Sequence, residues 1–98
     1  MPAIDVTPAQ WRIIRAILRA HLANVPVWAF GSRATGRAKP YSDLDLAIVT
    51  DDPVALDRLA ALADAFSESD LPWKVDLVDW ASTSERFREI IRRDRVVL

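Results

Sequence analysis

The sequence predicts an α/β (α+β) fold, a small mixed sheet covered by helices. Two observations predict it: segments with apolar residues at helical spacing alternate with short apolar segments typical of strands, and helix-start signals precede the first and last helical segments. Strands that alternate with helices place the helices against the sheet. With 98 residues, we expect a single domain over residues 1–98 with one core.

The first helix is expected to begin at Pro8. The segment Thr7-Pro8-Ala9-Gln10 has the pattern of a capping box, with proline at the first helical position. Apolar residues then recur at helical spacing until the Ala23–Pro26 segment ends the helix. The apolar run Val27–Phe30 is the first expected strand, and a short turn or helix is expected at residues 32–35.

A second strand is expected over Asp43–Thr50, whose apolar run indicates burial on both faces. Asp52-Pro53 is expected to begin the next helix, which ends in the polar segment 67–70. The residues expected on its core face are Leu56, Leu59, Ala63 and Phe66.

The third strand is expected over Trp73–Val78. Ser82 and Glu85 have the spacing of a second capping box, which predicts the start of the last helix. This helix is expected to break near Asp94, before the short apolar tail 96–98. The order of the strands in the sheet is not specified by the sequence.

Two carboxylates on the second strand suggest a metal site. Alternate side chains of a strand share a face about 6.5 to 7 Å apart, so Asp43 and Asp45 project the same way. Such close carboxylates repel each other, and burying them is costly unless a cation is present. Hard oxygen ligands of this kind suit Mg²⁺ that bridges to substrate phosphates.

The Gly31-Ser32 step supplies the complementary half of a nucleotide site. Gly31 has no side chain to keep a phosphate from the backbone, and Ser32 adds a hydroxyl donor. If a short helix starts at Ser32, its unpaired N–H groups form an anion site. Arg33 either assists phosphate binding or is solvated, and both interpretations stay open at this point.

These motifs together resemble a known signature. Gly31-Ser32-Arg33-Ala34-Thr35-Gly36 followed by Ser42-Asp43-Leu44-Asp45-Leu46 is similar to the signature of the minimal nucleotidyltransferases of the DNA polymerase beta-like superfamily. The resemblance extends over nearly the whole chain. It implies a nucleotidyltransferase core with a nucleotide site that includes Gly31, Ser32, Arg33 and Ser42.

The resemblance also implies the catalytic set. Asp43 and Asp45 would bind two Mg²⁺ ions, and a third carboxylate on a later strand would complete the metal site. Asp76 fits that role, whereas Asp79 has the opposite side-chain parity and ranks second. Two metals would clamp an in-line displacement, and Asp76 would accept the proton of the attacking hydroxyl.

The resemblance further implies a partner. Minimal nucleotidyltransferases are commonly paired with a helical HEPN protein, and in toxin–antitoxin pairs the transferase attaches AMP from ATP to a tyrosine of the HEPN toxin. We therefore expect an antitoxin acting as a protein adenylyltransferase, in a hetero-oligomer with its toxin. Two alternatives stay open: a two-component transferase acting on a small hydroxyl compound such as an aminoglycoside, and a non-catalytic antitoxin that acts by binding alone.

Composition narrows the class of protein. The formal net charge of −1 provides no overall electrostatic attraction to nucleic acid, so direct nucleic-acid binding is not expected. The chain contains no cysteine, which agrees with a reducing cytoplasm. No signal peptide and no apolar run long enough for a membrane span is found, so we expect a cytoplasmic protein without membrane contact.

Overall fold

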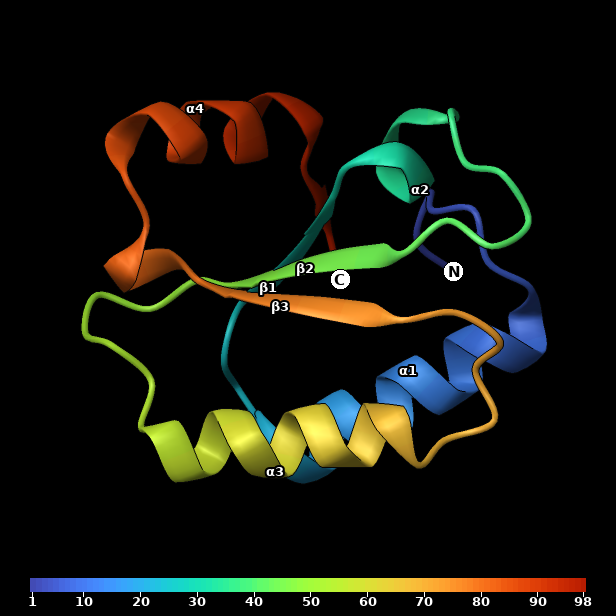
Figure 1. The fold of residues 1–98 in the computed structure, drawn as a ribbon, viewed down its shortest axis with the longest axis horizontal. Helices are drawn as coiled ribbons and strands as arrows, with labels where there is room; N and C mark the ends of the chain where they lie inside the picture. Colours follow the sequence, from blue (N-terminus) through green and yellow to red (C-terminus); the bar gives the residue numbers. More distant parts are fainter.

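The computed structural model describes residues 1–98 and shows a four-stranded mixed sheet with helices on both faces (Figure 1). This arrangement confirms the predicted fold class. In chain order the elements are α1 (Pro8–His21), β1 (Val27–Phe30), α2 (Ser32–Thr35), β2 (Leu44–Ile48), α3 (Leu56–Ser67), β3 (Val75–Asp79), the 3-10 helix η1 (Trp80–Ser82), α4 (Glu85–Asp94) and β4 (Val96–Val97).

The strand order is β3-β2-β1-β4. β2 and β3 are parallel and are joined by α3, as parallel neighbours require a crossover connection, whereas β1 is antiparallel to both β2 and β4. β4 comes from the apolar tail, which was not predicted as a strand. Its two residues carry too little pattern to be recognised, but they pair with Trp28 and Ala29 of β1.

The main core lies between the sheet and the two long helices α1 and α3, below the sheet in Figure 1. Alternate residues of β2, including Leu44, Leu46 and Ile48, are fully buried in it. A smaller cluster on the other face joins Phe30 and Ala47 to Ile91 of α4. β2 is therefore buried on both faces along most of its length, as its apolar run predicted.

A local signal sets the start of α1. The hydroxyl of Thr7 accepts a hydrogen bond from the Gln10 backbone N–H at 3.1 Å, and the Gln10 side chain accepts one from the Thr7 N–H at 2.9 Å. Both bonds of the predicted capping box are present.

The short helix predicted at residues 32–35 is α2.

The start of α3 was predicted too early. Helix begins at Leu56 rather than at Asp52-Pro53, because residues 50–54 form a tethered connection instead. The Thr50 hydroxyl donates to the Asp52 carbonyl at 2.8 Å, and the Val54 N–H donates to Asp79 Oδ2 at 3.2 Å. A long-range tertiary contact of this kind has no local sequence signal.

The predicted core face of α3 was wrong in part. Its buried residues are Leu62 and Phe66, with Leu59 packed beside them, whereas Leu56 is 84% exposed and Ala63 is also exposed. Packing against the main core therefore buries a helix face that is rotated relative to the predicted one.

The predicted capping box of the last helix was also wrong. The cap of α4 is Ser84, whose hydroxyl accepts from the Phe87 N–H at 3.2 Å. Ser82 instead donates to Asp79 Oδ2 at 3.0 Å. Both serines precede a helix-like pattern, but Ser82 lies in η1 and bonds to the nearby Asp79 at the end of β3.

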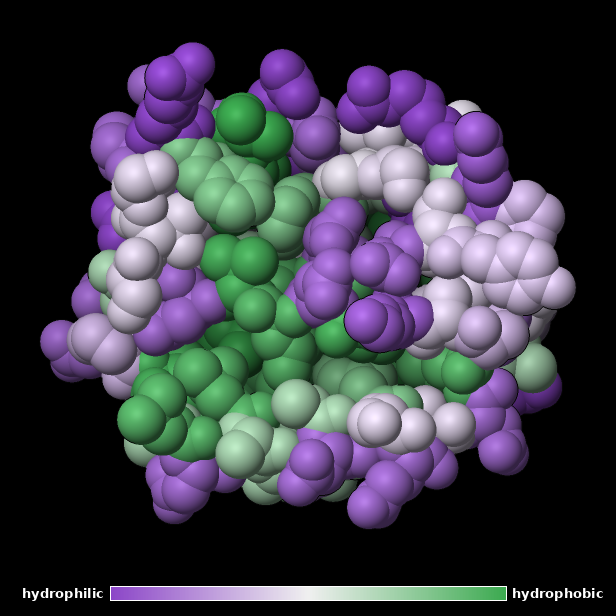
Figure 2. All heavy atoms as spheres, viewed as in Figure 1, coloured by the Kyte–Doolittle hydropathy of each residue, from purple (hydrophilic) through white to green (hydrophobic).

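The molecular surface is mixed in polarity. Figure 2 shows apolar surface running between α4 and α3 across the edge strand β3, with polar residues beside it. Leu59, Val75 and Leu77 contribute to a shallow groove there. No helix combines the length and the apolar character that crossing a bilayer requires.

The α3 docking face yields a direct test. We expect Leu62→Ala to lower the free energy of unfolding by about 2 to 5 kcal/mol, because it leaves a cavity at a fully buried position. Leu56→Ala on the same helix should change it by less than about 0.5 kcal/mol. Urea unfolding of both variants measures the difference, and equal losses would contradict this packing.

Candidate active site

Three carboxylates lie side by side on one face of the sheet. Asp45 of β2 is paired with Asp76 of β3 and, on its other side, with Phe30 of β1. Paired residues of adjacent strands project to the same face, and Phe30 packs against α4, so this is the α4 face. Asp43 precedes β2 by one residue and shares the side of Asp45. The structure therefore brings Asp43, Asp45 and Asp76 together.

The pKa values of Asp45 and Asp76 are both raised in this site. Burial, followed by the charges of Asp76 and Asp43, raises the pKa of Asp45 to about 6 from an ordinary 3.8. The pKa of Asp76 is also raised, first by lost hydration of its carboxylate and then by the charge of Asp43, although the residue is exposed on the edge strand. Neighbouring carboxylates thus oppose the ionisation of Asp45 and Asp76.

This donor set fits a magnesium ion that is shared with a substrate. Mg²⁺ prefers oxygen ligands and commonly takes one or two carboxylates together with substrate phosphates and water. No three acidic, histidine or cysteine side chains of the chain are gathered tightly enough to enclose a metal by themselves. The open arrangement therefore suits a bridging ion better than a closed protein cage.

Gly31 closes the other side of the site. It follows β1 with φ 76° and ψ −158°, a conformation that L side chains rarely adopt. A Cβ atom at Gly31 would overlap Oδ2 of Asp45, so the backbone of the turn lies directly against this carboxylate. Ser32 then begins α2, whose first N–H groups have no partner inside the helix.

The Arg33 side chain is not a free phosphate ligand, because its guanidinium is hydrogen-bonded inside the protein. It is only 5% exposed, and its guanidinium donates to backbone carbonyls and stacks over the Trp73 ring. Ser42 likewise serves the loop, since its hydroxyl accepts from the Lys39 N–H at 2.8 Å and its carbonyl accepts from Arg33 at 2.8 Å. The structure thus directs the Arg33 side chain into the protein, where it supports the loop, whereas Ser42 stays partly exposed on that loop.

Asp79 lies away from the three carboxylates. It pairs with Ile48 at the far end of β3, where its Oδ2 accepts from Val54 and Ser82. Its other carboxylate oxygen, Oδ1, is buried without a hydrogen-bond partner. Asp79 therefore ties the 50–54 connection and η1 to the sheet.

Lys74 was not predicted as a residue of the site. It stands two residues before Asp76, so the strand geometry points both side chains to the same side, and its charge lowers the pKa of Asp76 against the burial and the Asp43 interactions that raise it. Its carbonyl accepts from the Leu44 N–H at 2.9 Å, which places it beside Asp43. The i, i+2 spacing with Asp76 was the available signal.

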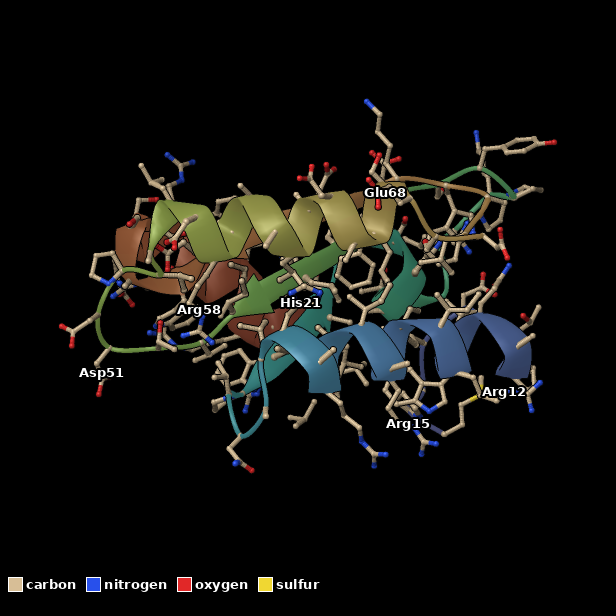
Figure 3. The ribbon with its side chains drawn as sticks, turned by 90° about the horizontal axis from the view of Figure 1, so that it is seen from below. Arg12, Arg15, His21, Asp51, Arg58 and Glu68 are labelled. Atoms are coloured by element: carbon tan, nitrogen blue, oxygen red, sulfur yellow. The ribbon has the colours of Figure 1, made fainter.

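The opposite face of the molecule carries no comparable group. Figure 3 shows this face from below, with α1 and α3 side by side and His21 between them. The carbonyl of His21 accepts from Arg58 of α3 at 3.1 Å, which joins the two helices. The single histidine therefore lies across the sheet from the carboxylates and supplies them with no base.

Known proteins with this pattern identify the family. The chain matches the family described as polymerase beta nucleotidyltransferase over residues 13–98. It belongs to this nucleotidyltransferase family. A probable protein adenylyltransferase, MntA of Haemophilus influenzae, is 53% identical to it over 95 residues, which cover 97% of this chain and 83% of that protein.

Solved structures extend the similarity of this nucleotidyltransferase to toxin–antitoxin proteins. A crystal structure of a toxin–antitoxin with AMP-PNP matches with a TM-score of 0.71 and 27% identity, over 86% of this chain and 68% of that one. A mutant of the toxin–antitoxin MntA-HpeT matches with a TM-score of 0.72 and 24% identity, over 96% and 72% of the two chains. At that identity the second match supports the fold alone.

The two glycines of the α2 turn provide a matched pair of variants. We expect Gly31→Ala to cost about 1 to 3 kcal/mol of stability and to weaken MgATP binding, because it strains the backbone and displaces Asp45. Gly36 has a similar φ of 75° but open space around it, so Gly36→Ala should cost about 1 to 2 kcal/mol and leave MgATP binding intact. Urea unfolding and titration calorimetry measure both effects, and tight MgATP binding by Gly31→Ala would contradict this geometry.

The raised pKa of Asp45 predicts a stability effect with a definite sign. The folded protein holds this proton more tightly than the unfolded chain, so ionisation of Asp45 destabilises the metal-free fold as pH rises from 3.8 to about 6. Above that range, Asp45→Asn should be more stable than the parent protein by on the order of 1 kcal/mol, after discounting for solvent screening.

Thermal unfolding in EDTA as a function of pH measures this effect. Asp51→Asn, on an exposed connection at the surface seen in Figure 3, is the control and should show no such gain. A metal-free Asp45→Asn protein less stable than the parent at neutral pH would contradict mutual repulsion at the site.

Proposed function

We propose that this protein is the antitoxin of a toxin–antitoxin pair and transfers AMP from ATP to a tyrosine of a HEPN-type toxin. In this proposal residues 1–98 form a single minimal nucleotidyltransferase domain, and the protein acts in the cytoplasm. The observation that carries the proposal is the 53% identity to a probable protein adenylyltransferase along 97% of the chain. The toxin–antitoxin structure with AMP-PNP supports ATP as the nucleotide and a toxin as the partner.

The proposed site divides into a metal side and a phosphate side. Asp43, Asp45 and Asp76 would hold two Mg²⁺ ions, which supply charge neutralisation for the phosphates and activation of the attacking hydroxyl. On the phosphate side, Gly31 leaves the backbone open and Ser32 offers its hydroxyl at the start of α2. Arg33 and Ser42 hold the loop between these two sides.

The proposed reaction is an in-line displacement at the α-phosphorus of ATP. The phenolic oxygen of the acceptor forms a bond to this phosphorus, and the bond to the bridging oxygen breaks and releases pyrophosphate. The phenolic proton passes to Asp76, whose carboxylate is exposed on the edge strand. Lys74, on the same side of β3, would add a positive charge near Asp76.

The position of Asp76 supports an acceptor that comes from another protein. Asp76 lies on the edge strand β3 and is exposed, and α4 covers only the neighbouring part of this face around Phe30, Ala47 and Ile91. A macromolecular hydroxyl can therefore approach Asp76 from the open side. A hetero-oligomer with the toxin follows from this proposal.

A labelling experiment tests the proposed activity. Purified protein with MgATP labelled on the α-phosphate is incubated with lysate of the native host, and labelled proteins are resolved on a gel. We expect one labelled band that disappears with Asp76→Asn and with EDTA, because both remove a part of the metal site, and that persists with Asp51→Asn. Mass spectrometry should then find AMP on a tyrosine of a helical partner.

Other outcomes separate the alternatives. Label in a small hydroxyl compound, with no labelled protein, would favour a small-molecule transferase. Neutralisation of the toxin by Asp76→Asn as well as by the parent protein would favour an antitoxin that acts by binding alone.

A further inference from the structure

We propose that Arg33 is a positioning residue that holds the first residues of β2 and β3 in register, so that Asp43 and Asp76 meet Asp45. This inference rests on the proposed function for its kinetic consequences, although its structural consequences are independent of that function. Arg33 stands next to Ser32 in the sequence, but it faces away from the site and into the protein.

The guanidinium of Arg33 connects segments that are distant in the sequence. Its Nε donates to the Ser42 carbonyl at 2.8 Å, and one terminal nitrogen donates to the Asp5 carbonyl at 2.7 Å. The other terminal nitrogen donates to the carbonyls of Lys39 and Pro40 at 3.3 and 3.0 Å. The planar group also lies over the Trp73 ring, 4.4 Å from its centre.

These contacts match the requirements of a buried cation. An arginine at 5% exposure is costly to bury unless its donors are satisfied, and here backbone carbonyls satisfy them. Because four carbonyls must converge on one planar group, their backbones are held in fixed relative positions. The loop that crosses from α2 to β2 therefore has little freedom while Arg33 is in place.

The residues that Arg33 contacts include two that precede the carboxylates Asp43 and Asp76 in the sequence. Ser42 directly precedes Asp43, so the bond from Arg33 ends one residue from the site. Trp73 is 8% exposed and precedes Lys74, whose carbonyl accepts from the Leu44 N–H at 2.9 Å. Arg33 thus contacts the entry of β2 and the approach to β3, on which Asp76 lies.

The N-terminal segment is part of the same support. The Asp5 N–H donates to the Arg33 carbonyl at 2.7 Å, while the Asp5 carbonyl accepts from the Arg33 guanidinium. The neighbouring Ile4 is buried in the main core. The family match begins at residue 13, so this part of the support lies outside the matched region.

Lysine cannot replace arginine in this role. Its ammonium group is a compact charge with three donors on a flexible stem, and it lacks the planar fork that reaches four carbonyls and stacks on an indole. Arg33→Lys therefore keeps the positive charge and removes the positioning. Arg12→Lys, at an exposed arginine of α1 on the surface seen in Figure 3, is the matched control.

The first measurement is amide hydrogen exchange in the metal-free protein, which needs neither an acceptor nor turnover. We expect exchange at residues 39–44 to be roughly tenfold faster or more in Arg33→Lys and unchanged in Arg12→Lys. If Arg33→Lys does not fold, Asp5→Pro, which removes the Asp5 N–H bond to the Arg33 carbonyl and also restricts the backbone at positions 4 and 5, should accelerate the same amides to a smaller extent. Unchanged exchange at residues 39–44 would overturn the proposal.

The second measurement separates positioning from direct phosphate contact. In the labelling reaction, Arg33→Lys should lower kcat by roughly 10- to 100-fold and raise the Mg²⁺ concentration that gives half-maximal rate, with a smaller change in KM for ATP. A lower melting temperature with an unchanged rate and Mg²⁺ requirement would reduce Arg33 to a structural residue and overturn the proposal. If the parent protein transfers no label, the proposed function fails, while the exchange measurement still decides the role of Arg33.

Discussion

Mutual repulsion among three carboxylates is the constraint on which the rest of this structure depends. Strand pairing places Asp45 beside Asp76, and chain direction places Asp43 next to both. Burial, followed by the charges of neighbouring carboxylates, raises the pKa of Asp45 and of Asp76, so ionisation of these groups is unfavourable when no cation is present. A site of this kind gains most from ligands that bring positive charge, which is the chemistry that a nucleotidyltransferase requires.

The remainder of the fold holds these groups against their repulsion. Leu44, Leu46 and Ile48 fix β2 in the main core, so the intervening Asp45 has no freedom to turn away. Gly31 lets the backbone of the α2 turn approach Asp45 closely, and Arg33 holds the loop that leads to Asp43. Stability is thus concentrated on the α1 and α3 face, and the opposite face is available for chemistry.

The sequence predicted the parts of the fold that depend on local signals. The capping box at Thr7, the strand Val27–Phe30 and the short helix after Gly31 all have such signals, and all are present. The start of α3 and the cap at Ser84 were missed because contacts with Asp79 decide them. The Val54 contact joins residues 25 apart in the sequence, and the Ser82 contact depends on how the end of β3 is placed.

In the candidate site too, the features with local sequence signals were predicted and those that depend on tertiary contacts were not. Side-chain parity sufficed to group Asp43 with Asp45 and to prefer Asp76 over Asp79, since it follows from strand geometry alone. The burial of Arg33 was not predictable, because four carbonyls from separate segments and the Trp73 ring create its environment. Nor did composition reveal that Lys74 lies beside the carboxylates, which depends on the register of β3 against β2.

The most direct test is an NMR titration of the aspartate carboxyl carbons, with and without saturating Mg²⁺. This account predicts that the Asp45 carboxyl of the metal-free protein titrates with a pKa of about 6. It also predicts that Mg²⁺ lowers this pKa, because a bound cation favours the charged form. An Asp45 that titrates near its ordinary value in both conditions, or whose pKa Mg²⁺ leaves unchanged, would contradict a cation site built from repelling carboxylates.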